Sequence, residues 1–446
     1  MGNRYLEGAY GPVHEEVTAV DLDVTGAIPD WLDGRYLRNG PNPVTPPDPA
    51  TYHWFTGDGM VHGVRLRDGR AEWYRNRWVR SQAVAEALGE KWAGGPVYND
   101  MDFSANTNVI GHAGRTFAIV ESGARPYELS DELDTVGPTN LDGTLPGGYT
   151  AHPKRDPQTG ELHAVSYCWA WGEQVQYTVI DREGRVRKVV DIPVTGSPML
   201  HDCSITESSV LIYDLPVDFD IELAMSGATF PYRWFDDQPA LVGVLPRDGE
   251  ATDVQWFEVE PCYVFHPMNA YDDGDRIVVD LVRHPRMFDA NRLGPDEGVP
   301  TLDRWTIDLS AGKVIEERID DRGQEFPRVD ERLVGARHRY GYSAGFVDEA
   351  DGGRGLGANA LLRHDLDRRT AASRSFGPGT TAGEFVHVAP AGAPEDSGIA
   401  MGFVYDRETD RSDLVIVDAQ TMEDVARVHV PQRVPHGFHG NWVSTT

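Results

Sequence analysis

The stretch VQYTVIDREGRVRKVVDI (residues 175–192) indicates the fold class, because two valine-rich, β-branched runs flank a Glu-Gly pair. Glycine tolerates the positive φ that a tight hairpin turn requires, so the pattern predicts strand, turn, strand. Similar strand-rich runs recur along the chain, in residues 60–79, 276–284, 303–319 and 412–430. The sequence therefore predicts an all-β protein built from successive hairpins.

The length of the chain narrows the choice among β architectures. Hairpins without alternating helices indicate a sandwich, a barrel or a propeller. A sandwich rarely reaches 446 residues, whereas a propeller with several four-stranded blades does. No linker or abrupt change of composition interrupts the sequence, so we expect one propeller domain over residues 1–446. Helical patterns are few: residues 81–93 predict a surface helix and residues 217–226 a weaker one.

Composition excludes several classes of partner. The 41 basic and 71 acidic side chains give a formal net charge of −30. This disfavours nucleic acid and anionic membranes, because both attract Lys and Arg. Three widely spaced cysteines match no metal-binding pattern and suit a reducing compartment. The N-terminal MGNRYLEGAYGPVHEE lacks the apolar core of a signal peptide, and no window holds the ~18 apolar residues of a membrane span. We therefore expect a soluble, cytoplasmic protein.

Two short motifs match catalytic patterns but lack the surroundings that those patterns need. GYSAG (341–345) fits the G-x-S-x-G nucleophile elbow around Ser343, yet the acidic, glycine-rich sequence after it predicts no helix. GRGLGA (353–358) fits a dinucleotide-binding pattern but lies in a polar loop outside any βαβ unit, so we interpret it as a surface turn. A hydrolase acting through Ser343 is kept as a competing hypothesis, which predicts metal-independent activity.

Four of the 15 histidines share a local pattern. Each follows an apolar or small residue and precedes Pro, Asp or Gly: His152 in YTAHPK, His201 in PMLHDCS, His266 in YVFHPMNAY and His439 in HGFHGNW. The pattern is typical of a strand end, and side chains from different blades converge only on a propeller's axis. Imidazole suits iron, copper, zinc and nickel, so a metal site is predicted there. His436 competes with His439 as a ligand, and a metal-free propeller that serves as a binding module is an alternative.

Three glutamates are candidates for support of these histidines. A histidine that binds a metal usually donates its other ring N–H to a carboxylate or a carbonyl. Glu121 in FAIVESGARP, Glu325 in GQEFPRVDER and Glu384 in AGEFVHVAP each lie beside apolar residues, where an unpaired carboxylate is costly. The alternative for Glu325 is a structural ion pair with Arg328.

Several motifs in order resemble the carotenoid cleavage oxygenase family over nearly the whole chain. They are GRYLRNGPNP (34–43), HWFTGDGMVHGV (53–64), ANTNVIGH (105–112), TAHPKRDPQTGEL (150–162), LHDCSIT, FHPMNAYDDGD, EFPRVDER and VPHGFHGNWV. The resemblance implies a seven-bladed β-propeller with a cap of loops and short helices over an axial metal site. It implies that His152, His201, His266 and His439 hold a non-haem Fe(II), with Glu121, Glu325 and Glu384 around them. It favours His439 over His436 and leaves His152 without a glutamate partner.

The same resemblance implies the reaction. Family members cleave a carbon–carbon double bond with O₂ and form two carbonyl products, so the expected partners are O₂ and a hydrophobic alkene. Thr107 matches a position close to the oxygen-binding site in relatives. We interpret Phe55, Tyr98 and Phe265 as walls of the substrate tunnel. The sequence does not indicate the oligomeric state.

The sequence specifies the substrate class less closely than it specifies the type of reaction. The FHPMNAYDDGD form resembles the carotenoid and apocarotenoid branch of the family, which we take as the main hypothesis. Stilbene cleavers typically carry a phenol-binding lysine just before T-A-H-P, where this chain has Thr144 in DGTLPGGYTAHP. A stilbene- or phenylpropene-cleaving dioxygenase is the alternative. Residues 81–95 are more polar than the apolar patch of membrane-docking relatives, so we expect at most weak peripheral membrane contact.

Overall fold

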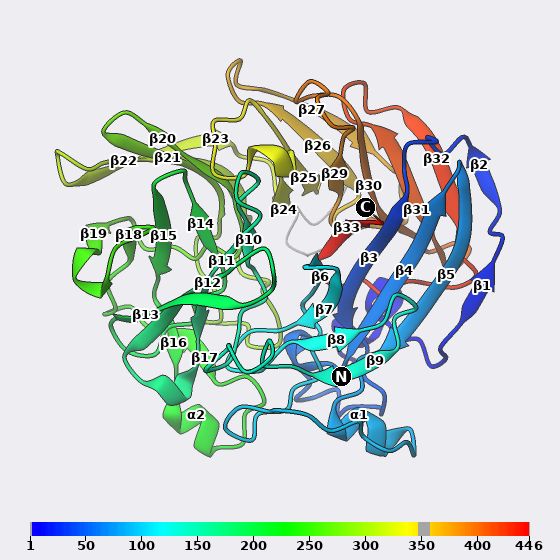
Figure 1. Ribbon diagram of the computed structural model, residues 1–446, viewed down its shortest axis with the longest axis horizontal. Helices are drawn as coiled ribbons and strands as arrows, with labels where there is room; N and C mark the ends of the chain where they lie inside the picture. Colours follow the sequence, from blue (N-terminus) through cyan, green and yellow to red (C-terminus); the bar gives the residue numbers. More distant parts are fainter. Residues whose placement is uncertain (1, 347–356, 446) are drawn as a thin grey trace.

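The computed structural model describes residues 2–346 and 357–445. In these residues the strands of seven sheets are arranged radially around a central axis, as Figure 1 shows. The predicted all-β, seven-bladed propeller is therefore confirmed. Residues 353–356 of the GRGLGA motif lie outside the described residues.

Five of the sheets contain four strands from one continuous part of the chain, and the other two combine strands from both ends of the chain. The first sheet comprises β3 (Gly34–Pro41), β4 (Gly59–Arg67) and β5 (Arg70–Trp78) with β1 (Thr18–Val20) and β33 (Gly440–Ser444), and the second comprises β6 (Asn108–His112), β7 (Arg115–Ile119), β8 (Tyr127–Leu129) and β9 (Thr135–Pro138). The third comprises β10 (Lys154–Arg155), β11 (Leu162–Tyr167), β12 (Gln174–Ile180) and β13 (Val186–Pro193). The fourth comprises β14 (Cys203–Ile205), β15 (Ser209–Asp214), β18 (Leu241–Pro246) and β19 (Gln255–Glu258). The fifth sheet comprises β20 (Pro267–Asp273), β21 (Arg276–Arg283), β22 (Thr301–Asp308) and β23 (Lys313–Asp320). The sixth comprises β24 (Gln324–Arg328), β25 (Tyr340–Gly345), β26 (Ala360–Asp365) and β27 (Thr370–Ser375). The seventh comprises β28 (Thr380–Ala382), β29 (Val386–Val388), β30 (Ile399–Asp406), β31 (Arg411–Asp418) and β32 (Asp424–His429) with β2 (Val24–Gly26).

The hairpins form where the sequence predicts them, because the turn residues adopt the required backbone conformation. Between β4 and β5, Asp68 and Gly69 have φ values of 49° and 70°, as a two-residue turn with positive φ at both positions requires. Residues on both faces of β21 are buried from Ile277 to Val282, since neighbouring blades pack face to face. The outermost strand of the same sheet, β23, is largely exposed. The apolar core therefore lies between the blades.

The ring closes through strands from both ends of the chain. β33 pairs antiparallel with β3, with Arg38 opposite Gly440 and Gly34 opposite Ser444. β2 pairs with the outer strand β32, with Val24 opposite Val428. These pairings join the first and last parts of the chain in two adjacent blades.

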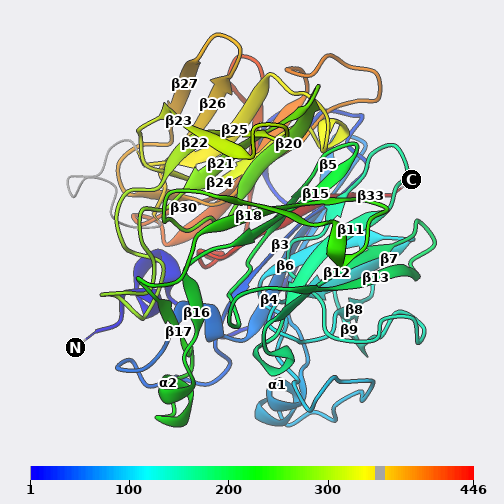
Figure 2. The ribbon, with the colours of Figure 1, turned by 90° about the vertical axis from the view of Figure 1, so that its left-hand side faces the viewer.

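Short helices and a ribbon make up the cap. They are η1 (Arg4–Leu6), η2 (Gly8–Tyr10), η3 (Trp54–Thr56), α1 (Gln82–Ala87), α2 (Ile221–Met225) and the hairpin of β16 (Val217–Phe219) and β17 (Tyr232–Trp234), with η4 (Trp169–Trp171), η5 (Ala251–Asp253) and η6 (Glu331–Leu333) elsewhere between strands. In Figure 2, α1, α2 and the β16–β17 ribbon lie together at the lower side of the molecule.

Both predicted helices are shorter than expected. The side chain of Ser81 caps α1 by accepting the N–H of Val84, but the helix ends at Ala87 because Gly89 adopts a φ of 70°. Residues 217–226 form strand β16 first, and α2 begins only after the cap residue Asp220. The prediction of a helix over the whole of 217–226 was therefore wrong in its first half.

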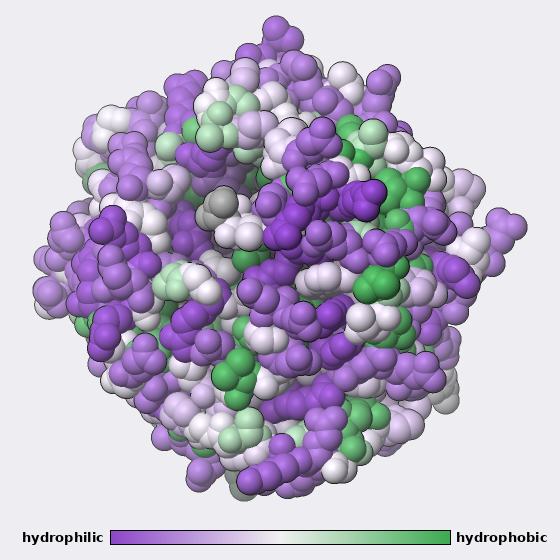
Figure 3. Space-filling view, turned by 45° about the vertical axis from the view of Figure 1, so that its right-hand side comes forward, coloured by the Kyte–Doolittle hydropathy of each residue, from purple (hydrophilic) through white to green (hydrophobic). Residues whose placement is uncertain are grey.

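The surface is mostly polar. The face in Figure 3 is largely hydrophilic, with small apolar groups scattered over it, as the net charge of −30 leads one to expect. No helix in residues 2–346 and 357–445 is both long and apolar enough to cross a membrane.

Candidate metal centre

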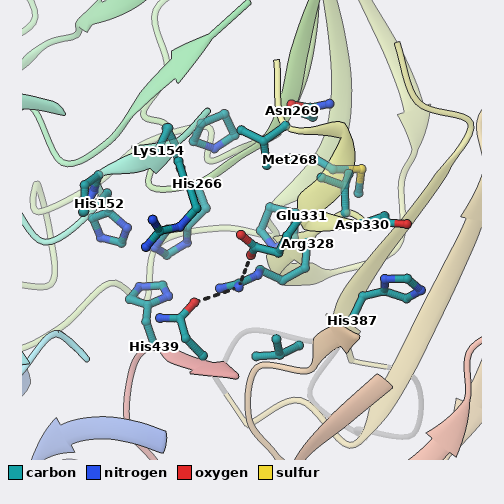
Figure 4. A pocket seen from close by; sticks show the side chains of 18 of the residues that line it. His152, Lys154, His266, Met268, Asn269, Arg328, Asp330, Glu331, His387 and His439 are labelled. Atoms are coloured by element: carbon teal, nitrogen blue, oxygen red, sulfur yellow. Dashed lines mark hydrogen bonds and ion pairs between the residues drawn. The ribbon is translucent and has the colours of Figure 1, made fainter. Parts of the chain in front are cut away.

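The four histidines with the shared sequence pattern meet at one point on the propeller axis. His152 and His201 lie two residues before the strands β10 and β14, and His266 and His439 lie directly before β20 and β33. They therefore lie at the starts of axial strands rather than at their ends. One ring nitrogen from each residue lies within 4.8 Å of the corresponding nitrogen of the others, and all four side chains are buried. Figure 4 shows His152, His266 and His439 turned toward one another.

His436 is not part of this group. Its ring stacks on that of Trp54 with the centroids 5.8 Å apart, and it packs edge-on against Tyr10. Its backbone N–H donates to the carbonyl of Ala9 at 2.6 Å. The structure therefore gives His436 a packing role in the cap and places only His439 at the axis.

Three of the four histidines each form a hydrogen bond with a glutamate. The Nδ1 of His201 lies 2.9 and 3.0 Å from the two carboxylate oxygens of Glu121. The Nδ1 of His266 lies 2.6 Å from Glu325, and that of His439 lies 3.1 Å from Glu384. Glu121 follows β7, Glu325 lies in β24 and Glu384 lies between β28 and β29. The glutamates thus come from the three blades that hold none of the four histidines.

These contacts determine which ring nitrogens are available to a metal. An ionised carboxylate accepts a hydrogen bond from Nδ1–H, so in the neutral ring Nε2 carries a lone pair. Burial lowers the pKa of His266 to about 3 despite the nearby Glu325. Burial, followed by the charge of the neighbouring His201, also lowers the pKa of His152 well below its usual value. Two of the histidines are therefore held in the neutral form that binds metals.

The donor set fits a divalent transition metal. The Nε2 atoms of His201 and His266 are 3.2 Å apart, and two lone pairs at that distance repel each other unless a cation lies between them. The Nε2 of His152 is buried and has no hydrogen-bond partner. Imidazole ligands suit iron, copper, zinc or nickel, and three buried carboxylates offset the charge of the ion. The geometry therefore supports a metal centre without specifying the element.

His152 is the member of the group without a glutamate. The carboxylate nearest to its Nδ1 is that of Asp202, at 3.8 Å, which is too long for a hydrogen bond. Asp202 instead accepts a hydrogen bond from Lys154 at 2.8 Å.

Two further residues contact the glutamates: His284, for which the sequence predicted no role, and Arg328, which the sequence suggested only as a partner of Glu325. The Nε2 of His284 lies 2.8 Å from Glu325, which therefore contacts two imidazoles. Arg328 donates to Glu384 at 3.2 Å and to Glu331 at 2.5 Å, whereas no ion pair between Arg328 and Glu325 is present among the described residues. The suspected Glu325–Arg328 pair is thus replaced by an Arg328–Glu384 pair. His284 follows the strand-rich run RIVVDLVR (276–283), and its place at the end of that run was the available sequence signal.

An aromatic cavity of about 400 Å³ lies on the cap side of the histidines. His201, His266 and His439 line it, together with Trp54, Phe55, Phe230, Phe265, Phe326 and Phe438. Thr107 also lines it; its carbonyl accepts the backbone N–H of His439 at 3.0 Å. Tyr98 is not among the described residues that line the cavity, and its hydroxyl accepts the indole N–H of Trp171 at 3.0 Å. The structure thus brings Phe55, Phe265 and Thr107 to the site, but not Tyr98.

A second cavity of about 340 Å³ lies among the axial strands and is polar. His152, His266 and His439 line it, and its charged residues form ion pairs within the described part of the chain, except Arg155, which donates to the carbonyl of Gly111. Lys154 pairs with Asp202, Arg328 with Glu331 and Arg332 with Asp330. Figure 4 shows this cavity with Arg328 between two carboxylates. The histidine group therefore lies between an aromatic cavity and an electroneutral polar one.

Ser343 is buried in a sheet and does not occupy the exposed turn of a nucleophile elbow, although the Nε2 of His364 lies 3.3 Å from its hydroxyl. It lies inside β25, is 1% exposed and donates a hydrogen bond to Gln324 at 2.7 Å. A nucleophile elbow instead exposes its serine at a sharp turn between a strand and a helix. The GYSAG match is part of a sheet.

Comparison with known proteins gives the same fold and a family. The family described as retinal pigment epithelial membrane protein (RPE65) matches residues 10–444. The chain is 51% identical to a carotenoid cleavage oxygenase of Mycobacterium tuberculosis, over all of this chain and 98% of that protein. It is 31% identical to carotenoid 9,10(9′,10′)-cleavage dioxygenase 1 of Pisum sativum, over 100% of this chain and 90% of that protein. Its structure is similar to the crystal structure of the Pseudomonas brassicacearum lignostilbene dioxygenase, with a TM-score of 0.90, 27% identity and coverage of 100% and 99%. The chain therefore belongs to the RPE65 family of carotenoid cleavage oxygenases.

Proposed function

We propose that this protein is a non-haem Fe(II)-dependent dioxygenase that cleaves a carbon–carbon double bond of a carotenoid or apocarotenoid. The observation that carries the proposal is the convergence of four buried imidazoles in the wall of an aromatic cavity. One alkene and one O₂ give two carbonyl products, so both oxygen atoms enter the products and no organic cosubstrate is needed. Residues 1–446 act in this proposal as one propeller domain.

The residues of the chain bind, orient and shield the reactants. His152, His201, His266 and His439 are the proposed iron ligands, and the three glutamates fix the orientation of three of them. Bound Fe(II) supplies the activation of dioxygen. The aromatic side chains offer flat surfaces on which a conjugated alkene stacks, and they exclude water. We assign Thr107 to the wall beside the oxygen-binding position, supported by its hydrogen bond with His439.

Two observations support a carotenoid-like substrate over a stilbene. The relatives named above that match best in sequence carry carotenoid-cleaving names. Thr144 stands where a phenol-binding lysine is expected in stilbene cleavers, and its hydroxyl donates to the carbonyl of Leu141 at 2.7 Å. Thr144 is not among the described residues that line the aromatic cavity. We also place the protein in the cytoplasm, supported by its three free, buried cysteines.

Product analysis tests the proposal. The protein is reconstituted with Fe(II) without oxygen and then given an apocarotenal or a hydroxystilbene under ¹⁸O₂, and the product masses are measured. We expect two carbonyl products from the apocarotenal, each with label from O₂, and slower turnover of the stilbene. Ser343→Ala serves as the matched control and should retain turnover. Activity without iron that disappears in Ser343→Ala would instead establish a hydrolase, and faster cleavage of the stilbene would overturn the substrate assignment.

A further inference from the structure

The charges in the wall of the aromatic cavity are of one sign. Four acidic residues line it, Asp58, Asp102, Glu121 and Glu325, and none of its described lining residues is Lys or Arg. The polar cavity on the other side of the histidines has four acidic and four basic lining residues, the latter being Lys154, Arg155, Arg328 and Arg332. The two cavities that meet the same histidines thus differ in net charge, and only the aromatic one has uncompensated carboxylates.

Two of these carboxylates, those of Asp58 and Asp102, form no hydrogen bond with any of the four histidines. One carboxylate oxygen of Asp58 accepts the backbone N–H of Val44 at 3.0 Å. Asp102 accepts a hydrogen bond from the Tyr127 hydroxyl and another from the backbone N–H of Gln82 at 2.6 Å. Neither aspartate forms an ion pair within residues 2–346 and 357–445. All these partners are neutral, so the negative charges remain uncompensated.

The histidine group does not offset this charge. Neutral imidazoles contribute no charge, and Glu121, Glu325 and Glu384 lie against three of them. Glu384 is paired with Arg328, so Glu121 and Glu325 would just balance a divalent ion and the centre would add no positive charge to the cavity. A substrate whose double bond lies at the histidines therefore extends its ends through surroundings that are apolar or negative.

We infer that the aromatic cavity selects alkenes with uncharged ends, and that Asp58 and Asp102 reject substrates that carry a carboxylate. This inference rests on the proposed function. Alcohol, aldehyde and ester ends are compatible with the cavity, because they bring no like charge and hydroxyl groups can donate to a carboxylate. A carboxylate end is repelled by both aspartates and finds no cationic side chain to pair with. Repulsion between unit charges several ångströms apart near a protein surface lowers binding by roughly 10- to 100-fold.

The test compares three apocarotenoids of the same polyene length that end in an aldehyde, a carboxylic acid or the methyl ester of that acid. The ester has the bulk of the acid but not its charge. kcat/KM is measured with the iron-loaded protein, and Kd is measured without oxygen from quenching of tryptophan fluorescence. The variant Asp58→Asn/Asp102→Asn removes both charges and keeps one acceptor oxygen at each position, and Asp273→Asn/Asp275→Asn removes the same charge at an exposed hairpin.

We expect the acid to have a kcat/KM at least ~10-fold below that of its ester. The Asp58→Asn/Asp102→Asn variant should reduce this difference several-fold, whereas the hairpin variant should preserve it. Equal cleavage of acid and ester would overturn the inference and leave the proposed function intact. A difference that persists in Asp58→Asn/Asp102→Asn would overturn the role of these aspartates. If none of the three compounds is cleaved, the proposed function fails. In that case, equal Kd values for the acid and the ester would also refute the charge selection.

Discussion

Glu325→Gln removes one buried negative charge beside the histidines while keeping the shape of the side chain. Glu325 is 2% exposed and contacts the Nδ1 of His266 at 2.6 Å and the Nε2 of His284 at 2.8 Å. Burial alone would raise the pKa of Glu325, but the hydrogen bonds that it accepts from His266 and His284 hold it well below the usual range. The carboxylate is therefore ionised at neutral pH, and the substitution removes a full charge.

The expected loss follows from the strength of one charge-assisted hydrogen bond. Such bonds contribute about 1.5–3 kcal/mol, and each 1.4 kcal/mol corresponds to a factor of about ten in Kd. We expect the Kd for Fe(II) to rise about 10- to 100-fold, the usual effect of removing a group that supports a metal ligand. Glutamine can still accept a hydrogen bond from one imidazole, so the fold should be retained.

The assay is an anaerobic titration of the metal-free protein with Fe(II) against a competing chelator. Glu331→Gln is the matched control, because Glu331 pairs with Arg328 and contacts none of the four histidines. Unchanged affinity in Glu325→Gln would refute the supporting role of Glu325. An equal loss in both variants would show that total charge, rather than the contact with His266, determines the affinity.

Three further predictions concern the centre and the core. His439→Ala should lose stoichiometric iron in elemental analysis, whereas His436→Ala should retain it; the opposite result would reverse their assignment. Phe265→Ala should lower the free energy of unfolding by about 3–5 kcal/mol in urea, because this ring is 3% exposed; a loss below about 1 kcal/mol would contradict its place in the core. Burial lowers the pKa of His53 to about 3 and that of His163 to about 4, from about 6.5 in the unfolded chain. Between these folded-state pKa values and about 6.5, the unfolded chain binds more protons than the folded protein does. The metal-free protein should therefore be fully stabilised by these residues above pH ~6.5 and become less stable as the pH falls toward 4. Urea unfolding at several pH values checks this, and stability that rises on acidification would contradict it.

The hairpins could be predicted from the sequence because their determinants are local. Turn pairs such as Asp68-Gly69 and the valine-rich strands around them specify strand and register within a few residues. The four histidines share a pattern because each precedes an axial strand. The resemblance to a family then chose between His439 and His436, which differ only in how the chain packs around the cap.

The partners of the glutamates could not be predicted in the same way. Glu121 lies 80 residues before His201 in the sequence, and the two come from blades that are not consecutive. Arg328 lies near Glu325 in sequence but contacts Glu384, and the β-bulge between Glu325 and Arg328, where Phe326 has a φ of 54°, interrupts the regular alternation of side chains along β24. Such contacts depend on how whole blades are placed around the axis, which no local pattern encodes. The length of α1 was also missed, because Gly89 ends the helix before the apolar pattern ends.

The pairing of β33 with β3 has a consequence for biosynthesis. His439 directly precedes the strand that completes the first blade, so three imidazoles emerge from the ribosome long before the fourth. Until residues 439–444 have been translated, the first blade lacks β33 and the nascent chain offers an incomplete set of nitrogen donors. A premature stop codon anywhere before His439 would therefore yield a chain that lacks both the fourth nitrogen donor and the strand that completes the first blade.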